Sequence, residues 1–208
     1  WALLIIFSYL FFSDYNFDLS DESYYILSSL YLKNIIGIHS HFGYLFSSIL
    51  QDLNFNIRAF RIFGIVSYLF ANIYFIFNFA KYITRTNQID NIKYELILVF
   101  IVASFYFYKH WLLTPSYNFN VVISLLIYLG THFYYLNNEK NLKKFSTKYF
   151  IIIFLLSVFL LISVLSKITS ILIFLSLFFI FLFSTENKIK YLTFALGIAT
   201  SFFILFIF

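Results

Sequence analysis

The chain has 208 residues, of which 62% are hydrophobic and 11% are charged, and its mean hydropathy is +0.89. Soluble domains contain about 45–50% apolar and roughly 25% charged residues, so this composition excludes an ordinary soluble fold. Cysteine is absent, which excludes disulfide scaffolds, thiolate metal sites and cysteine nucleophiles. The net charge of +5 lies in segments between apolar runs, where it flanks a membrane, and it does not indicate a nucleic-acid partner.

Seven apolar runs are candidates for membrane-spanning helices, which need about 20 residues, and the first run is cut short. They are residues 1–12, 59–80, 96–113, 119–136, 149–166, 168–184 and 191–208. The chain begins and ends inside apolar runs, so we expect a fragment whose first span is cut short. A signal sequence fits 1–12 less well, because no small-residue cleavage site follows it. We predict an all-α fold, a polytopic transmembrane helical bundle that forms a single domain over residues 1–208.

The run from 149 to 184 is too long for one span and slightly short for two. Ser166, Lys167, Thr169 and Ser170 interrupt it. A charge at the centre of the bilayer costs at least about 2.5–3.5 kcal/mol. We therefore predict that Lys167 lies in a hairpin turn near a membrane surface, between two short helices.

The distribution of Lys and Arg predicts the orientation, because short cytoplasmic loops collect these residues. If the first span runs outward, most basic residues fall in inner loops: Lys81, Arg85, Lys93, Lys140, Lys143, Lys144, Lys148, Lys188 and Lys190. The outer segments then contain Lys33, Arg58, Arg61, Lys109 and Lys167, together with Asp14, Asp18, Asp21, Glu22 and Asp52. Three successive inner loops agree on this topology.

The first outer segment, residues 13–58, is long for a connection inside a compact bundle, and long loops are often functional. Mixed apolar and polar stretches at 24–31 and 42–53 favour helices that lie along the membrane surface. We therefore expect a long non-cytoplasmic first loop that contains surface helices.

The densest group of carboxylates in this loop includes Asp21 and Glu22. Ser20 can cap a helix whose first turn contains both, since the N-terminal dipole favours acidic side chains, and this structural role explains the pair without any chemistry. The functional interpretation is a general base beside a second carboxylate that orients it or raises its pKa. Asp14 and Asp18 lie close by in the sequence and are interpreted as solvating or supporting residues.

Arg58 and Arg61 stand three residues apart at the outer start of a span, on one helix face. They are either anchors that snorkel to the headgroups or a clamp for a lipid phosphate, whose oxygens match the guanidinium fork. Lys167, also on the outer side, adds a third cation.

Two further polar groups are candidate binding sites. The stretch from Thr114 to Asn118 contains the only proline, which predicts a turn between spans, and Tyr117 and Asn118 are candidates for the lining of a polar cavity. His39 and His41 are two apart in an irregular stretch, which is weak evidence for a metal site and is typical of interfacial polar residues.

Taken in order, these features resemble the N-terminal half of GT-C superfamily membrane glycosyltransferases, which include protein O-mannosyltransferases and the lipid A aminoarabinose transferase. The resemblance rests on Asp21-Glu22 before Ser23-Tyr24-Tyr25, on Arg58 and Arg61, on the Thr114 to Asn118 junction, and on Ser166-Lys167. It implies a hexosyl- or pentosyltransferase of the cell envelope, in the bacterial plasma (inner) membrane as a multi-pass protein.

The resemblance also implies roles for individual residues. Asp21 and Glu22 would be catalytic, with one carboxylate activating or orienting an acceptor, which is a lipid, a glycan or a protein. The donor would be a polyprenyl-phosphate-linked sugar, with Arg58, Arg61 and Lys167 stabilising the leaving phosphate. Candidate substrate-binding residues also include Tyr25, His41, Tyr117 and Asn118. Members of the superfamily with such donors resemble metal-independent enzymes, so we expect neither a metal nor a cofactor. The expected partners are membrane lipids, and no nucleic acid is expected.

Two other functions remain open. A transporter or flippase for a lipid-linked or small anionic substrate usually has its site near the midplane on broken helices, whereas the predicted spans contain almost no ionisable residue. A structural membrane subunit is the third possibility.

Overall fold

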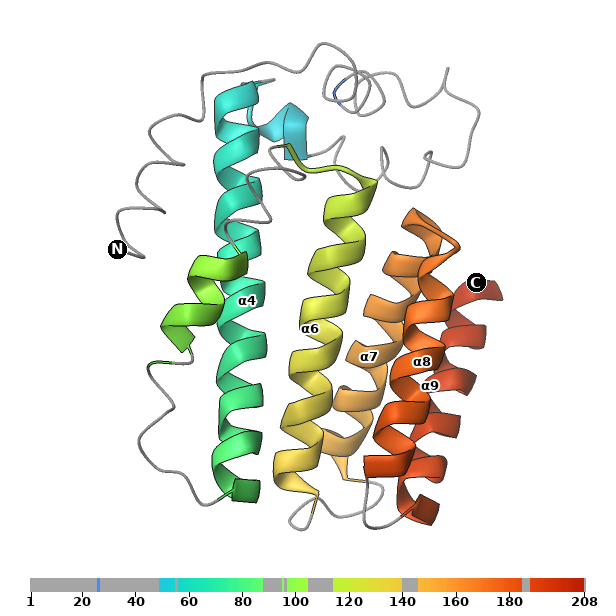
Figure 1. The fold of residues 1–208 in the computed structure, drawn as a ribbon. Helices are drawn as coiled ribbons and strands as arrows, with labels where there is room; N and C mark the ends of the chain where they lie inside the picture. Colours follow the sequence, from blue (N-terminus) through green and yellow to red (C-terminus); the bar gives the residue numbers. More distant parts are fainter. Residues whose placement is uncertain are drawn as a thin grey trace.

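The computed structural model describes residues 26, 49–54, 56–87, 95, 97–104, 114–139, 146–184 and 188–207. Regular structure in these ranges is entirely helical, which confirms the predicted helical class for this part of the chain. The long helices are α4 (Ile57–Asn87), α6 (Tyr117–Asn138), α7 (Thr147–Ser166), α8 (Ser170–Ser184) and α9 (Lys188–Ile207). Residues 97–104 are also helical and lie beside α4 (Figure 1).

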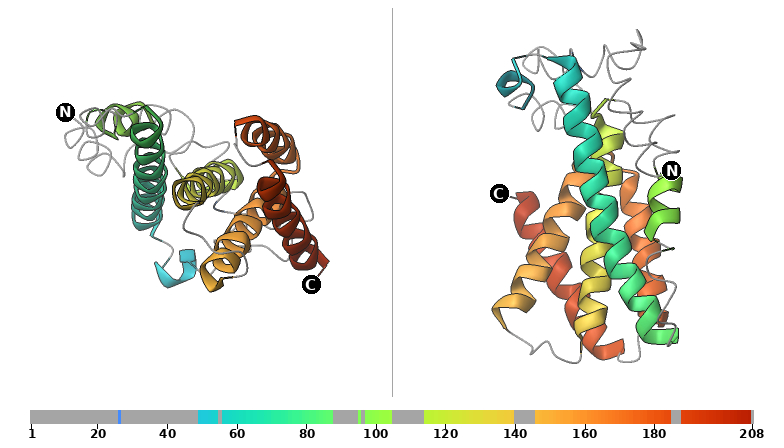
Figure 2. Two further views of the ribbon diagram at one scale, coloured as in Figure 1. Left: turned by 90° about the horizontal axis from the view of Figure 1, so that it is seen from below. Right: turned by 90° about the vertical axis from the view of Figure 1, so that its left-hand side faces the viewer.

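Helix α6 is at the centre of the arrangement. It lies between α4 on one side and the group of α7, α8 and α9 on the other (Figure 2). Helices α4, α6 and α8 start at the same end of the molecule, and α7 and α9 run in the opposite direction (Figure 1). As a result, residues that are distant in the sequence meet at the two ends of the helices.

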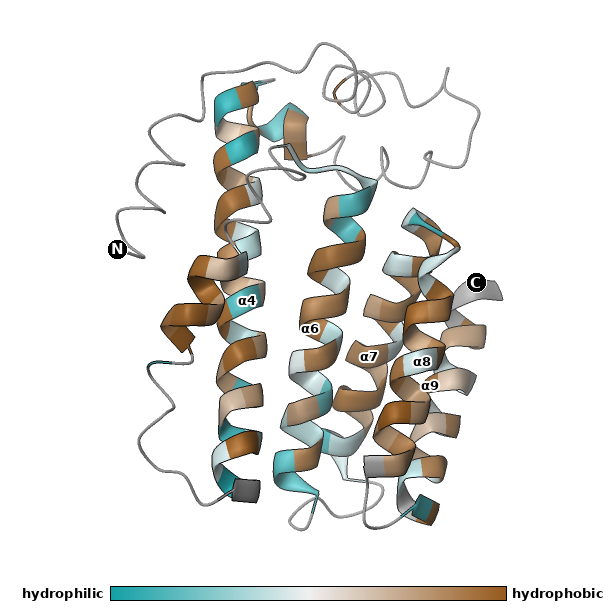
Figure 3. Ribbon diagram, in the orientation of Figure 1, coloured by the Kyte–Doolittle hydropathy of each residue, from teal (hydrophilic) through white to brown (hydrophobic). Residues whose placement is uncertain are grey.

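Three described helices are long and apolar enough to cross a membrane: Ile57–Arg85, Tyr117–Asn138 and Thr147–Ser166. They contain the predicted spans 59–80, 119–136 and 149–166. The remaining apolar helices, Ser170–Phe183 and Tyr191–Ile204, are shorter. With 15 residues, α8 extends about 22 Å, against about 30 Å for the hydrocarbon core of a bilayer. Hydrophilic residues gather toward the ends of the helices (Figure 3).

Several predicted segments lie outside the described residues. They are span 1–12, residues 105–113 of the span predicted at 96–113, and most of the outer segment 13–58. Within that segment, residues 49–52 are helical, followed by Asn54 with a positive φ of 51°. Asparagine tolerates this left-handed conformation better than most residues, so it suits the short turn that leads into α4.

Polar side chains define where α4, α6 and α7 begin. The Asn56 side-chain oxygen accepts a hydrogen bond from the backbone N–H of Ala59 at 3.1 Å. Ser116 and Ser146 accept in the same way from Phe119 and Tyr149, at 3.2 and 3.3 Å. These bonds satisfy N–H groups that the first turn of a helix leaves without partners.

The contact between α4 and α6 is close and partly polar. Gly130 allows it, because a Cβ atom there would lie 2.6 Å from the Tyr74 ring and 3.1 Å from the Cα of Phe75. The hydroxyls of Tyr74 and Thr131 are hydrogen-bonded at 3.1 Å. Small residues and interhelical hydrogen bonds are the means by which helices associate where lipid replaces water.

A second polar contact between α4 and α6 lies near their other ends. The Asn137 amide donates to the carbonyl of Asn78 at 2.9 Å. The Arg85 guanidinium donates to the carbonyls of Leu136 and Asn137, near the last turn of α6. A cation is favourable at the C-terminus of a helix, where carbonyl groups lack partners within the helix.

Aromatic residues fill the space between α6, α7, α8 and α9. The rings of Tyr135 and Phe194 stack with centroids 3.8 Å apart, and Tyr128 meets Phe174 edge to face at 4.7 Å. The Ser157 hydroxyl is 3.0 Å from the carbonyl of Ile198, which ties α7 to α9. Aromatic pairs in these geometries contribute about 0.5–1.5 kcal/mol beyond the burial of their surface.

Candidate functional site

Five of the candidate binding residues lie at one end of the packed helices. Arg58 and Arg61 are near the start of α4, Tyr117 and Asn118 begin α6, and Lys167 lies between α7 and α8. Helices α4, α6 and α8 all start at this end (Figure 1). We call this end, defined by these five residues, the turn end.

At the turn end, Lys167 and Tyr117 are in contact. The ammonium nitrogen of Lys167 lies 5.8 Å from the centroid of the Tyr117 ring. Helix α7 stops at Ser166 because the backbone of Lys167 is extended, and the N–H of Lys167 donates to the carbonyl of Ser163. Such cation–π contacts are worth about 0.5–1 kcal/mol at exposed sites. Two separately predicted residues are thus brought together by the packing of α6 against the α7–α8 turn.

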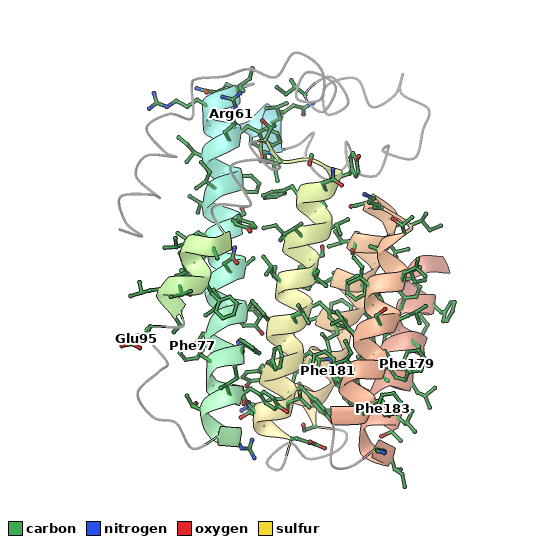
Figure 4. The ribbon with its side chains drawn as sticks, in the orientation of Figure 1. Arg61, Phe77, Glu95, Phe179, Phe181 and Phe183 are labelled. Atoms are coloured by element: carbon green, nitrogen blue, oxygen red, sulfur yellow. The ribbon has the colours of Figure 1, made fainter. Side chains whose placement is uncertain are left out.

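The two arginines of the turn end have different environments. Arg58 is exposed, whereas the side chain of Arg61, one turn further along α4, is only 4% exposed. Figure 4 shows Arg61 near the start of α4. Residues three apart share a helix face, so the difference follows their position along α4: Arg58 is in its exposed first turn and Arg61 is one turn further in. Arg58 is therefore the more accessible of the two to a ligand.

The cations of the turn end are distributed around α6. Since α6 lies between α4 and α7 (Figure 2), the arginines are on one side of it and Lys167 is on the other. Tyr117 and Asn118, in the first turn of α6, are half-buried. Of the five turn-end residues, Lys167 and Tyr117 are in contact.

The opposite end of the helices carries cations that the sequence analysis assigned to cytoplasmic loops. Lys81 and Arg85 are in the last turns of α4, and Lys148 and Lys188 are in the first turns of α7 and α9. The geometry therefore separates these four residues from the turn end by the length of the helices (Figure 1).

Sequence reasoning missed a group of buried polar atoms near the turn end. The Asn120 amide nitrogen and the hydroxyls of Ser163, Ser166 and Ser170 are buried without a hydrogen-bond partner within the described part of the chain. The serine side chains are at most 2% exposed. Buried polar groups are nearly always paired, so each exception calls for an explanation. The signal in the sequence is the pair Ser166 and Ser170 beside Lys167, which predicts a turn and does not indicate the burial of these hydroxyls.

His132 is a further residue that sequence reasoning missed. It is completely buried in α6, and neither ring nitrogen has a hydrogen-bond partner among the described residues. Its ring stacks on Phe181 of α8 with centroids 3.8 Å apart, and Tyr191 and Phe194 of α9 lie within 6 Å. An ionisable residue within an apolar helix is a functional candidate, although the shared aromatic packing explains its position equally well.

The remaining candidates cannot be compared with the geometry. Asp21, Glu22, Tyr25 and His41 lie outside the described residues, as do Asp14, Asp18 and His39. Within the part that the structure describes, no group of three or more His, Cys, Asp or Glu side chains is arranged to hold a metal ion. No family model, curated protein or solved structure matches this chain.

Proposed function

We propose that the chain is the membrane-embedded part of a glycosyltransferase of the GT-C type. It transfers a sugar from a polyprenyl-phosphate donor to an acceptor on the non-cytoplasmic side of the membrane. The observation that carries the proposal is the cationic turn end, where Lys167 lies over Tyr117 beside the first turn of α6. A lipid phosphate is an anion at the membrane edge, and the exposed ammonium group of Lys167 supplies a cation that suits it.

The proposed membrane topology rests on the charges at the two ends of the helices. Lys81, Arg85, Lys148 and Lys188 gather at one end and agree with the positive-inside rule for a cytoplasmic face. The turn end then faces outward, on the same side as the loop that contains Asp21 and Glu22. In this proposal the chain is a polytopic bundle in the bacterial inner membrane.

The proposed reaction is a single displacement at the anomeric carbon of the sugar. An acceptor hydroxyl forms the new bond to this carbon while the bond to the phosphate oxygen breaks. The acceptor proton passes to the carboxylate of Asp21 or Glu22, and the other carboxylate orients the acceptor. Polyprenyl phosphate leaves with the electron pair of the broken bond, and Lys167 stabilises its charge.

The test is transfer by the full chain in vesicles that contain a polyprenyl-phosphate sugar. Lys167→Gln should lower kcat/KM for the donor about tenfold or more, the loss expected for one charge-assisted hydrogen bond. Lys148→Gln is the matched control, because it removes an exposed cation from the opposite end. Equal losses in both variants would refute the role of the turn end.

The alternative function is a transporter or flippase for a lipid-linked or small anionic substrate. The observation in its favour is His132, an ionisable side chain buried within an apolar helix. Movement of labelled donor across the vesicle without formation of a glycosidic bond would support this alternative. Loss of that movement in His132→Phe, with Lys167→Gln still active, would locate the site in the interior rather than at the turn end.

A further inference from the structure

An apolar groove of about 340 Å³ lies between α8 and α9, with Tyr128 of α6 in its wall. Leu175 of α8 and Leu192 and Leu196 of α9 line the groove and are exposed. The groove therefore opens sideways, toward the surface that lipid would contact in a membrane. Its volume falls within the range of small-molecule sites, about 300–1,000 Å³. A molecule dissolved in the membrane can thus enter from the side.

Much of the lining is aromatic. Six of the lining side chains carry rings: Tyr128, Phe174, Phe178, Tyr191, Phe202 and Phe203. Tyr128 meets Phe174 edge to face at 4.7 Å between ring centroids, and Phe178 stacks on Tyr191 at 5.9 Å. Aromatic rings favour stacked or edge-to-face contacts with further rings. A flat ring is therefore the ligand shape that suits this lining.

Two tyrosines bring polar atoms to the groove. Among the described residues that line it, only Tyr128 and Tyr191 carry a polar side-chain atom. They come from different helices, α6 and α9, and both of their rings pack against the ring of His132, with centroids 6.0 and 5.5 Å away. The contact with a common neighbour places the two tyrosines next to one another in the wall.

The hydroxyls of these two tyrosines are available to a ligand. Neither forms a hydrogen bond within the part of the chain that the structure describes, whereas the Tyr74 hydroxyl is bonded to Thr131. Both side chains are buried, yet neither hydroxyl belongs to the enclosed polar atoms without a partner, which include the hydroxyl of Tyr135. The hydroxyls of Tyr128 and Tyr191 therefore retain access to open space, which the groove provides.

The position of the groove favours an uncharged ligand. No charged side chain lines it among the described residues. Tyr128 lies near the middle of α6, about 16 Å along the axis from Tyr117 at the start of the helix. An isolated charge at that depth in a membrane is costly. A neutral molecule whose oxygen atoms accept hydrogen bonds from tyrosine hydroxyls avoids this cost.

We propose that the α8–α9 groove binds an uncharged, lipid-soluble molecule whose flat ring carries two carbonyl oxygens, which is the chemistry of a quinone. The ring contacts the aromatic side chains of the lining, and the hydroxyls of Tyr128 and Tyr191 donate hydrogen bonds to the two carbonyl oxygens. The site goes beyond the proposed function, because it involves neither the turn end nor the outer carboxylates and can exist with or without sugar transfer.

The experiment uses the full chain in phosphatidylcholine vesicles and a radiolabelled benzoquinone that carries a decyl chain and an azide on the ring. After photolysis, cross-linked peptides are identified by mass spectrometry. We expect saturable labelling of α6, α8 and α9 at residues that line the groove, including Tyr128, Phe178 and Tyr191. Unlabelled decyl-benzoquinone should compete. Decyl-p-xylene, in which methyl groups replace both carbonyl oxygens, and cholesterol, which has a single hydroxyl, should compete at least tenfold less well.

Variants that remove one oxygen atom test the two donors. Tyr128→Phe and Tyr191→Phe should each weaken quinone binding about two- to tenfold, the effect of one hydrogen bond, and the double variant should weaken it further. Tyr134→Phe is the matched control, because it removes the hydroxyl of an exposed tyrosine of α6 that does not line the groove, and it should bind like the native chain. Ala199→Phe should abolish labelling by filling the groove.

The outcomes decide the proposal without reference to transfer activity. Equal competition by decyl-p-xylene would overturn it, because the groove would then accept any apolar ring, and equal competition by cholesterol would overturn the quinone class. Unchanged quinone binding in the double variant of Tyr128 and Tyr191 would overturn the role of the hydroxyls. Tyrosine and phenylalanine have nearly the same shape, so this arm stays informative even if Ala199→Phe fails to fold.

Discussion

Gly130 is the residue at which the packing of α4 against α6 can be tested most sharply. An added Cβ atom would lie 2.6 Å from Cδ1 and 2.8 Å from Cε1 of Tyr74, and 3.1 Å from the Cα of Phe75. Ordinary contacts begin near 3.4 Å, so the nearest atoms must separate by about 0.8 Å (3.4 minus 2.6). The Tyr74 ring cannot simply swing aside, because its hydroxyl is bonded to Thr131, and Phe75 contributes backbone.

Gly197 provides the matched comparison within α9. A Cβ atom there would meet the Cδ1 atom of Ile153 at 2.9 Å and nothing else closer than 3.7 Å. That contact is with the far end of a flexible side chain, which can move at little cost. Both changes to alanine gain about 1 kcal/mol of helix propensity, so this contribution cancels between them. Overpacking then makes Gly130→Ala less stable than Gly197→Ala by about 1–3 kcal/mol.

The assay is unfolding of the purified chain in mixed micelles with increasing dodecyl sulfate, followed by circular dichroism. The free energy of unfolding is compared for the native chain, both glycine-to-alanine variants, Tyr74→Ala alone, and the double variant Tyr74→Ala with Gly130→Ala. In the Tyr74→Ala background the penalty at Gly130 should shrink, because the atoms that the new Cβ meets first are gone. Equal stability of Gly130→Ala and Gly197→Ala would refute the close approach of α4 and α6.

Three further predictions use variants elsewhere in the chain. Arg85→Gln should lower the free energy of unfolding by about 0.6–1.7 kcal/mol, because it removes hydrogen bonds to two carbonyls near the end of α6. The control is Lys81→Gln, which changes an exposed neighbour and should leave the free energy of unfolding unchanged in the same titration. His132→Phe should be as stable as the native chain or more so, because it keeps the aromatic stacking and removes two ring nitrogens that have no hydrogen-bond partner among the described residues. A loss above about 2 kcal/mol would contradict this. The chain has no cysteine, so a single introduced cysteine reports the side of the membrane on which it lies. Lys167→Cys should react with an impermeant maleimide outside intact cells, whereas Lys188→Cys should react only after permeabilisation. Labelling of both cysteines from one side would refute the topology.

Much of the helical arrangement could be predicted from hydropathy. The span expected at 119–136 lies within α6, Tyr117–Asn138, which starts directly after Pro115 and the capping Ser116. The cost of a charge in the bilayer predicted the turn at Lys167. In the structure α7 ends at Ser166 and α8 begins at Ser170, so the turn is confirmed. Helix α4 extends beyond residue 80 to Asn87 because a helix can continue into water with polar residues, which a hydropathy window does not detect.

The contacts at the candidate site could not be predicted in the same way. Helices α7 and α8 are apolar on all sides, so no stripe in the sequence indicates which face meets a neighbour. The contact of Lys167 with Tyr117 and the burial of Ser163 depend on how the helices pack. The difference between Arg58 and Arg61 has the same origin, since both look alike as residues at the start of a span.

Sugar transfer by the full chain is the central claim, and the carboxylates of the outer loop give its most direct test. Vesicles with the full chain, a radiolabelled polyprenyl-phosphate sugar and an acceptor extract should yield a labelled glycoside. Asp21→Asn and Glu22→Gln should each lower the rate by about 10²-fold or more, as expected for loss of a general base. Undiminished transfer in both variants, or passage of the donor across the membrane with no glycoside formed, would contradict the account.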